Sequence, residues 1–111
     1  MFEMSQRGAV HVLSGNQPLT AAHKEEITDL CSECFENGQP RLVIDLSGVP
    51  LMDSLGLELL LDLRDGCQKR GGAMQICSPN ALCRDILVAT ALTAQFAIFD
   101  DQSAAVGSYS R

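Results

Sequence analysis

The clearest structural signal in the sequence is the segment RLVIDLSGVPLMDSLGL, residues 41–57. It opens with an apolar run, Arg41 to Leu46, without polar alternation, which is typical of a central strand covered on both faces. A polar-flanked loop, Ser47-Gly48-Val49-Pro50, follows. A helix is then expected from about Leu55 to Lys69, where leucines cover much of the helical circumference and indicate burial on more than one side. A strand followed by a loop and a helix of crossover length predicts parallel pairing in an α/β layer.

Before this segment, the pattern predicts a hairpin and then a helix. The two expected strands are Phe2 to Gln6 and Ala9 to Ser14. After a turn at Gly15-Asn16-Gln17-Pro18, Thr20 is placed to cap a helix that runs to about Glu36. Asn37-Gly38 ends this helix, since glycine suits a left-handed position past the last turn. Its inward face is one stripe at helical spacing, formed by Ile27, Leu30, Cys31, Cys34 and Phe35.

After this segment, two further pairs of strand and helix are expected. Gly71-Gly72 leads into the first of the two strands, which are Ala73 to Cys77 and Phe96 to Phe99. Ser78-Pro79 is interpreted as the cap and first residue of a helix through about Ala89, and its inward face is assigned to Leu82, Ile86 and Leu87. A short helix, capped by Asp101, is expected from about Gln102 to Val106. The order ββαβαβαβα predicts an α/β fold with a mixed, mostly parallel sheet of four to five strands, an N-terminal β-hairpin and about four helices.

Composition narrows the class of protein. The chain has 111 residues, 46% hydrophobic and 20% charged, which is expected of one globular domain over residues 1–111 with a flexible tail in the last few residues. The net charge of −6 and the absence of a basic patch argue against nucleic acid. No stretch is long and apolar enough for a transmembrane helix, and the start of the chain lacks the pattern of a secretory signal. We therefore expect a cytoplasmic protein.

The five cysteines are an odd number, which favours reduced thiols over a disulfide scaffold. Cys31 and Cys34 form a C-x-x-C pair, the alternative being a redox pair or half a zinc site. Both lie on the apolar stripe of a predicted helix, no second such pair follows, and His11 and His23 lie at no ligand spacing. We expect buried small side chains, with no metal and no cofactor.

Asp53-Ser54-Leu55-Gly56 lies where the loop after the central strand becomes a helix N-terminus. The free N–H groups and the helix dipole favour negative charge there. Ser54 is therefore a candidate helix cap, with Asp53 as a second candidate. Position alone favours the capping role, but Ser54 is also a candidate exposed hydroxyl that can be phosphorylated, and the two roles are compatible.

The segment Val43 to Leu57, together with GGAM at residues 71–74, closely resembles the STAS domain family of bacterial anti-sigma factor antagonists. The similarity continues through Ser78-Pro79-Asn80 to the run Phe96 to Asp100. The resemblance implies a small α/β domain that binds an anti-sigma factor, commonly a serine protein kinase, and so frees a sigma factor. In that family the serine after the signature aspartate is phosphorylated by the kinase, which ends binding, and a phosphatase reverses the reaction.

Carried over to this sequence, the resemblance implies that Ser54 is the phosphate acceptor and Asp53 the neighbouring acid. Gly56 would keep the helix start free of a side chain for an approaching partner. Leu51, Met52 and Leu55 are candidates for exposed contacts around Ser54 or for core residues, and the pattern leaves both interpretations open.

Two departures from the family pattern concern partner binding. Leu55 stands where many relatives have a second hydroxyl residue. The run Gly15-Asn16-Gln17-Pro18 lacks the acid that relatives often carry there, so Asn16 and Gln17 either hydrogen-bond a partner or form a simple turn.

The sequence leaves a second binding function open and argues against an enzyme. The alternative binding function is a STAS interaction module without phosphorylation, such as a subunit of a transporter or signalling assembly. An enzyme is not expected, because no nucleophile, base and orienting group are discernible and His11 and His23 have no obvious partners. The pairs Asp62/Asp65 and Asp100/Asp101 are interpreted as solvated charge rather than a cation site.

Overall fold

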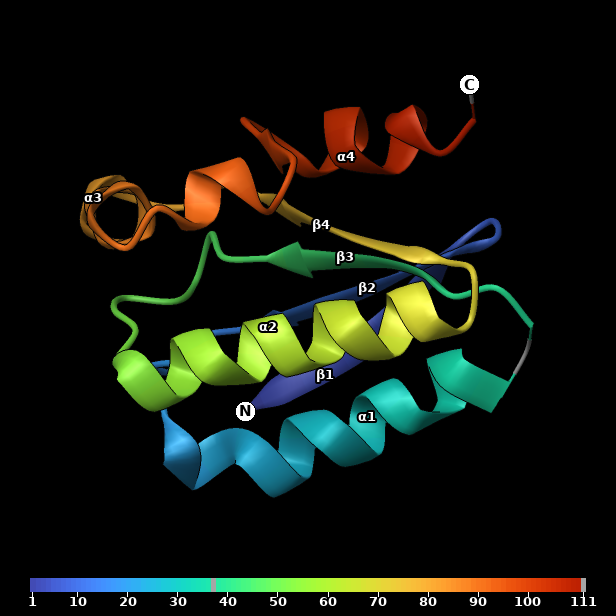
Figure 1. Cartoon of the computed structure of the whole chain (residues 1–111), viewed down its shortest axis with the longest axis horizontal. Coiled ribbons are helices and arrows are strands. Elements are labelled where there is room, and N and C mark those ends of the chain that lie inside the picture. The colour runs from blue at the N-terminus through green and yellow to red at the C-terminus, as the bar shows by residue number, and fades with distance from the viewer. Residues whose placement is uncertain (37, 111) are drawn as a thin grey trace.

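The computed structural model describes residues 1–36 and 38–110. Asn37, expected at the end of the first helix, and Arg111, the last residue of the expected tail, lie outside the described residues. In the described residues the elements, shown in Figure 1, follow the predicted order with two added 3-10 turns: β1 (Phe2–Arg7), β2 (Val10–Gly15), η1 (Ala21–His23), α1 (Lys24–Glu36), β3 (Arg41–Asp45), α2 (Ser54–Lys69), β4 (Ala73–Cys77), α3 (Ala81–Ala89), η2 (Leu92–Ala94), β5 (Ile98–Phe99) and α4 (Gln102–Ser108).

The five strands form one mixed sheet in the order β1-β2-β3-β4-β5. β1 and β2 pair antiparallel, and the other three pairs are parallel. β3 is the middle strand, and its residues from Leu42 to Asp45 are all buried. The predicted α/β fold, the hairpin and the central strand are therefore confirmed.

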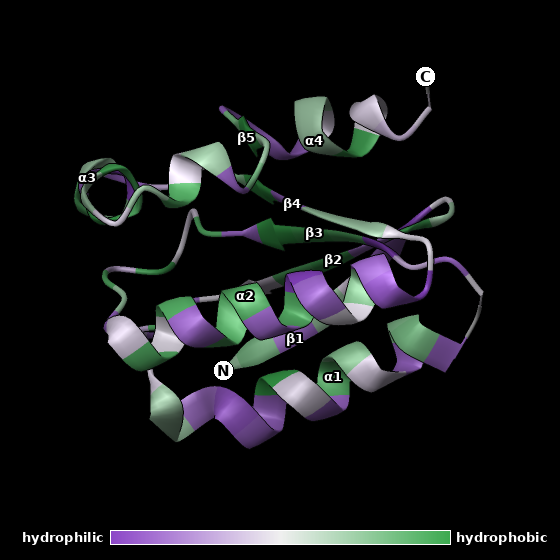
Figure 2. Ribbon diagram, viewed as in Figure 1, coloured by the Kyte–Doolittle hydropathy of each residue, from purple (hydrophilic) through white to green (hydrophobic). Residues whose placement is uncertain are grey.

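Helices cover both faces of the sheet. Figure 1 shows α1 and α2 side by side on one face and α4 on the other. In Figure 2 apolar and polar segments alternate around α1 and α2, as expected of helices with one buried face. The core against α1 and α2 includes Ile27, Cys31, Leu42, Leu60 and Leu63. The smaller core under α4 consists of Val10, Val12, Val43, Cys77 and Ala105.

The start of α3 differs from the prediction. Asn80, and not Ser78, caps the helix: the Asn80 side chain accepts a hydrogen bond from the N–H of Cys83 at 2.8 Å. Pro79 therefore precedes the cap instead of opening the helix. Leu82, assigned to the inward face, is 49% exposed, whereas Leu87 is buried and Ile86 packs partly against the core.

The other boundaries differ less. The predicted helix at Thr20 begins as η1, whose cap is the Thr20 hydroxyl, and continues as α1. Of the last predicted strand, only Ile98 and Phe99 pair with β4, in the register Ile76↔Ile98 and Cys77↔Phe99. α4 is capped by Asp101, as predicted.

The expected C-terminal tail is packed at least as far as Tyr109. α4 extends to Ser108. The hydroxyl of the next residue, Tyr109, lies within donating distance of two carbonyl oxygens, that of Leu42 at 2.9 Å and that of Ala73 at 3.0 Å. This contact attaches the end of the chain to two central strands.

All five cysteines are free and buried, as predicted. Burial raises the pKa of Cys31 and of Cys67 to about 12, so both thiols stay protonated and unreactive near neutral pH. Within the described residues no group of three His, Cys, Asp or Glu side chains is placed to hold a metal ion. No helix in this part of the chain has the length and apolar character needed to span a membrane.

Candidate functional site

The candidate site is the loop that joins β3 to α2, and a buried carboxylate holds its beginning. Asp45, at the end of β3, accepts a hydrogen bond from the Ser47 N–H through Oδ1 at 2.9 Å. Its Oδ2 accepts from Nε2 of Gln102 at 2.8 Å, and Oε1 of Gln102 accepts from Nη1 of Arg7 at 3.0 Å. Asp45 was not among the predicted site residues, although a lone acid in an otherwise apolar central strand is a signal for a partnered carboxylate.

The middle of the loop is fastened to α3. Nδ2 of Asn80 donates to the carbonyl oxygens of Val49 and Pro50, both at 3.2 Å. The thiol of Cys83 donates to the Val49 carbonyl at 3.4 Å. Three hydrogen bonds therefore join the loop after β3 to the start of α3.

The end of the loop is fastened to the segment that follows the Asn16-Gln17 turn. The Leu19 N–H donates to the Leu51 carbonyl at 3.0 Å, and the Asp53 N–H donates to the Leu19 carbonyl at 3.3 Å. Between these two bonds, Met52 forms an isolated parallel bridge with Leu19 and is only 5% exposed. Of the two interpretations of Met52, the core one is correct, because its side chain is enclosed beneath the loop.

Asp53 is the cap of α2. Its Oδ1 accepts from the Gly56 N–H at 2.8 Å, and its backbone is extended, as a cap residue requires. Ser54 is therefore the first helical residue and not the cap. It is exposed, and no hydrogen bond joins its hydroxyl to another described residue. The capping alternative for Ser54 is wrong, since the neighbouring carboxylate takes that role.

Gly56 serves packing, which corrects the expectation that it opens the helix start to a partner. It is buried, and a Cβ atom there would meet the Leu19 carbonyl oxygen at 2.0 Å and the Leu19 carbonyl carbon at 2.7 Å. Glycine is needed because the backbone of Leu19 lies directly against the first turn of α2.

Two leucines beside Ser54 are exposed. Leu51 is 41% exposed and Leu55 is 51% exposed, so for these two the surface interpretation is correct. The exposed residues next to Ser54 are Pro50, Leu51, Asp53 and Leu55, and Ser47 and Gly48 are exposed earlier in the same loop. The Ser54 hydroxyl therefore lies at the N-terminus of α2, with the exposed side chains of Leu51 and Leu55 nearby in the sequence.

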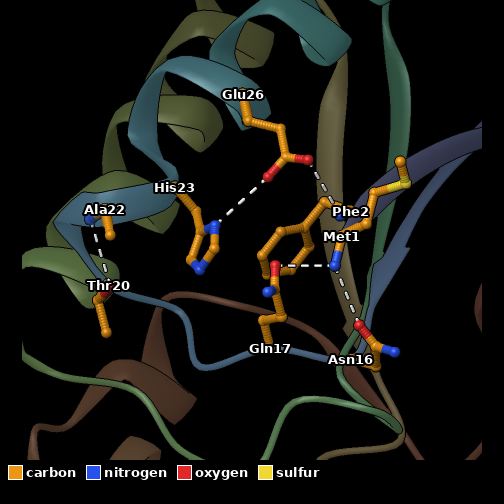
Figure 3. Close-up of polar contacts among 8 residues, drawn as sticks. All are labelled: Met1, Phe2, Asn16, Gln17, Thr20, Ala22, His23 and Glu26. Carbon is orange, nitrogen blue, oxygen red and sulfur yellow. Dashed lines mark hydrogen bonds and ion pairs between the residues drawn. The ribbon is translucent and has the colours of Figure 1, made fainter.

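Asn16 and Gln17 make contacts within the chain. Oδ1 of Asn16 and Oε1 of Gln17 accept from the amino group of Met1, at 3.1 and 2.7 Å (Figure 3). The turn interpretation therefore has direct support, and any contact of these two residues with a partner stays a prediction.

His23, for which the sequence indicated no obvious partner, has one in the structure. Its side chain is 19% exposed, and Nδ1 lies 3.3 Å from Oε1 of Glu26. The other oxygen of Glu26 accepts from the Phe2 N–H at 3.3 Å, and the His23 ring meets the Phe2 ring edge-on (Figure 3). This cluster joins the start of β1 to the start of α1.

The acidic pairs have structural contacts. Asp65 lies 3.3 Å from Arg64, Asp100 lies 3.4 Å from Arg84, and Asp101 caps α4 through the Ala104 N–H at 2.7 Å. These contacts agree with the interpretation of the pairs as ordinary surface charge.

Comparisons with known proteins identify the family and the fold. A family model described as the STAS domain matches residues 1–105. A search of curated proteins finds no match. The crystal structure of protein TM1081 from Thermotoga maritima is 23% identical, with a TM-score of 0.90, and the match covers 99% of this chain and 95% of that one.

Two other solved structures have the same fold in different settings. The anti-sigma factor antagonist SpoIIAA in its unphosphorylated form, from Bacillus, is 17% identical with a TM-score of 0.80, and the match covers 96% of this chain and 93% of that one. The murine anion transporter Slc26a9 is 19% identical with a TM-score of 0.77, over 92% of this chain but only 18% of the transporter. At these identities the likeness shows a shared fold.

Proposed function

The chain belongs to the STAS domain family, and from this membership we propose that it is an anti-sigma factor antagonist whose binding is switched off by phosphorylation of Ser54. It binds an anti-sigma factor of the serine kinase type and so releases a sigma factor, and a serine phosphatase restores the binding form. This role places the protein in the cytoplasm. It is a binding module without catalytic activity or cofactor, and it acts without contacting nucleic acid.

The observation that carries this proposal is the state of Ser54. Its hydroxyl is exposed and free of hydrogen bonds to the described residues, on a loop held by Asp45, Asn80 and Leu19. A kinase can therefore reach it without unfolding the site. SpoIIAA, which has the same fold, has been solved in both an unphosphorylated and a phosphorylated form.

Phosphorylation at Ser54 is compatible with the fold and unfavourable for docking. The free N–H groups of the first turn of α2 favour an anion, so the helix tolerates the phosphate. The phosphate adds nearly two negative charges between Leu51 and Leu55, and a docked partner would have to desolvate them. A penalty of about 3 kcal/mol lowers affinity more than 100-fold.

The test is phosphorylation by purified serine kinase-type anti-sigma factors of the source organism, with ATP, followed by intact mass. Wild type should gain one phosphate and Ser54→Ala none. Ser47→Ala is the matched control, because Ser47 is an exposed serine of the same loop, and it should gain one phosphate. The proposal fails if no kinase modifies wild type, or if Ser54→Ala is modified equally.

A second candidate function is a STAS module of a transporter or signalling assembly that works without phosphorylation. The likeness to Slc26a9, where the matching region is 18% of a much larger chain, favours it. Absence of phosphate on wild type, together with binding to a membrane-transport subunit in pull-down with that purified subunit, would support this candidate over the first.

A further inference from the structure

The side chain of Asn80 is bonded at both of its ends. Its Oδ1 accepts from the Cys83 N–H at 2.8 Å and so caps α3. Its Nδ2 donates to the carbonyl oxygens of Val49 and Pro50, both at 3.2 Å. Aspartate or serine would cap the helix equally well, but an ionised aspartate has no donor for the loop and serine has only one short hydroxyl. Asn80 therefore does more than a helix cap requires.

The turn that leads to Asn80 is strained. Ser78 has a backbone φ of 57°, in the left-handed region that residues with a side chain seldom adopt. Two hydrogen bonds hold it there: its N–H donates to the Phe99 carbonyl at 2.9 Å, and its hydroxyl donates to the Asp100 carbonyl at 3.2 Å. Strained residues persist only where the surrounding structure fixes them, and they gather at functional sites. The strain is a second indication, independent of the bonds of Asn80, that this turn has a specific task.

The loop that carries Ser54 is held from two sides. Asn80 binds it on one side, at the two carbonyls just described. On the other side, the backbone of Leu19 bonds the Leu51 carbonyl at 3.0 Å and the Asp53 N–H at 3.3 Å. Leu51 is 41% exposed, so these attachments do more than packing to fix its place relative to Ser54. A surface that is ordered beforehand loses less conformational entropy when a partner binds it.

We propose that Asn80 is a positioning residue for the phosphorylation of Ser54, because its amide holds the loop in the arrangement that the kinase binds. It acts through the backbone of Val49 and Pro50 and not on the hydroxyl itself. The inference rests on the proposed function and deepens it, since it makes α3 part of the recognition of Ser54. The contact orders the loop before binding and takes no part in the reaction. Its loss should therefore raise KM and leave kcat unchanged.

The test uses variants that keep the cap and lose the contact with the loop. Asn80→Ser and Asn80→Asp both retain a good capping side chain, and Asn80→Asp also places a carboxylate oxygen against the two carbonyl oxygens. The kinase is the anti-sigma factor that modifies wild type in the assay above, with ATP, below the thermal midpoint of every variant. Each variant should raise the KM for the chain at least about fivefold and keep kcat within about twofold of wild type. The larger increase is expected for Asn80→Asp.

Thr90→Ala is the matched control on the same helix. The Thr90 hydroxyl lies 2.7 Å from the Ile86 carbonyl oxygen and 3.3 Å from that of Leu87, to which it donates. The variant thus loses side-chain contacts of α3 but none with the loop, and its KM and kcat should stay within about twofold of wild type. If Thr90→Ala raises KM as much as Asn80→Ser does, the effect comes from the stability of α3 and the positioning role is wrong.

A second measurement needs no kinase. The Asp53 N–H is bonded to the Leu19 carbonyl, and its hydrogen exchange should be faster in Asn80→Ser than in wild type because the loop opens more readily. The amide of Val43, in the middle strand, reports global unfolding and is the internal reference. Equal exchange at Asp53 in the two proteins would mean that Asn80 does not hold the loop, and would overturn the inference.

The outcomes separate the inference from the proposed function. If wild type is phosphorylated and both Asn80 variants keep the wild-type KM, the positioning role is wrong while the proposed function stands. A fall in kcat with an unchanged KM contradicts the positioning role in the same way. If no kinase-type anti-sigma factor modifies wild type, the proposed function fails and the inference fails with it. Should Asn80→Ser be unfolded at the assay temperature, Asn80→Asp decides by the same criteria.

Discussion

The backbone of Leu19 lies close to Gly56, and this contact decides whether Gly56→Ala raises or lowers the free energy of unfolding. Gly56 is the third residue of α2, and replacing a helical glycine by alanine normally stabilises a protein by up to about 1 kcal/mol. In this position the added Cβ would lie 2.0 Å from a backbone oxygen, about 1 Å closer than atoms of this kind approach. Either α2 or the Leu19 segment must move, and overpacking of this kind costs about 3 kcal/mol. The steric cost exceeds the gain in propensity, so Gly56→Ala should lose about 2 kcal/mol.

The assay is thermal unfolding followed by circular dichroism, with Gly107→Ala as the matched control. Gly107 is also a helical glycine, but a Cβ atom there meets nothing within 4 Å, so the propensity gain should appear undiminished. For 111 residues, 1 kcal/mol corresponds to about 4 °C, so Gly56→Ala should lower the midpoint by about 8 °C and Gly107→Ala should raise it by about 4 °C. A rise in both variants would refute the close packing of α2 on Leu19.

Three further predictions concern the cap, the phosphate and the thiols. Asp53→Ala should lose about 1 kcal/mol in urea unfolding because it removes the cap, whereas Ser54→Ala should stay within about 0.5 kcal/mol of wild type; equal losses would contradict the cap assignment. Ser54→Asp should weaken the complex with the anti-sigma factor while leaving the thermal midpoint nearly unchanged, and undiminished binding in calorimetry would remove the phosphate argument. Burial raises the pKa of Cys31 and Cys67 from 9.0 to about 12, so above pH 9 the unfolded chain loses thiol protons that the folded chain keeps. Stability should therefore fall as pH rises from about 9 toward 12, with a smaller fall in Cys31→Ala, as measured by urea unfolding at each pH.

Local patterns predicted the elements of this fold because each pattern has one physical interpretation. An unbroken apolar run such as Leu42 to Ile44 is stable only between two covering layers, which is where β3 lies. The roles inside the site were harder to predict, because Asp53 and Ser54 are both good capping residues. The choice between them depends on where the helix begins, and the two bonds between Leu19 and the loop contribute to fixing that point. These bonds join residues more than thirty positions apart in the sequence, so a local sequence pattern cannot predict them.

For α3, in contrast, the helical periodicity of the sequence already distinguishes the buried face from the exposed face. Leu82 and Leu87 are five residues apart, which separates them by about 140° on a helix, so they cannot share a narrow buried face. The residue that accompanies Leu87 inward is Cys83, four positions before it and only about 40° away, and it is fully buried. The predicted inward face included Leu82 and omitted Cys83, yet Cys83 packs inward and its thiol donates to the carbonyl oxygen of Val49 in the loop before Ser54. With Cys83 placed inward, Leu82 and Val88 must face solvent. The contact of Cys83 with Val49 therefore fastens the inner side of α3 to the loop, and it leaves Leu82 and Val88 exposed.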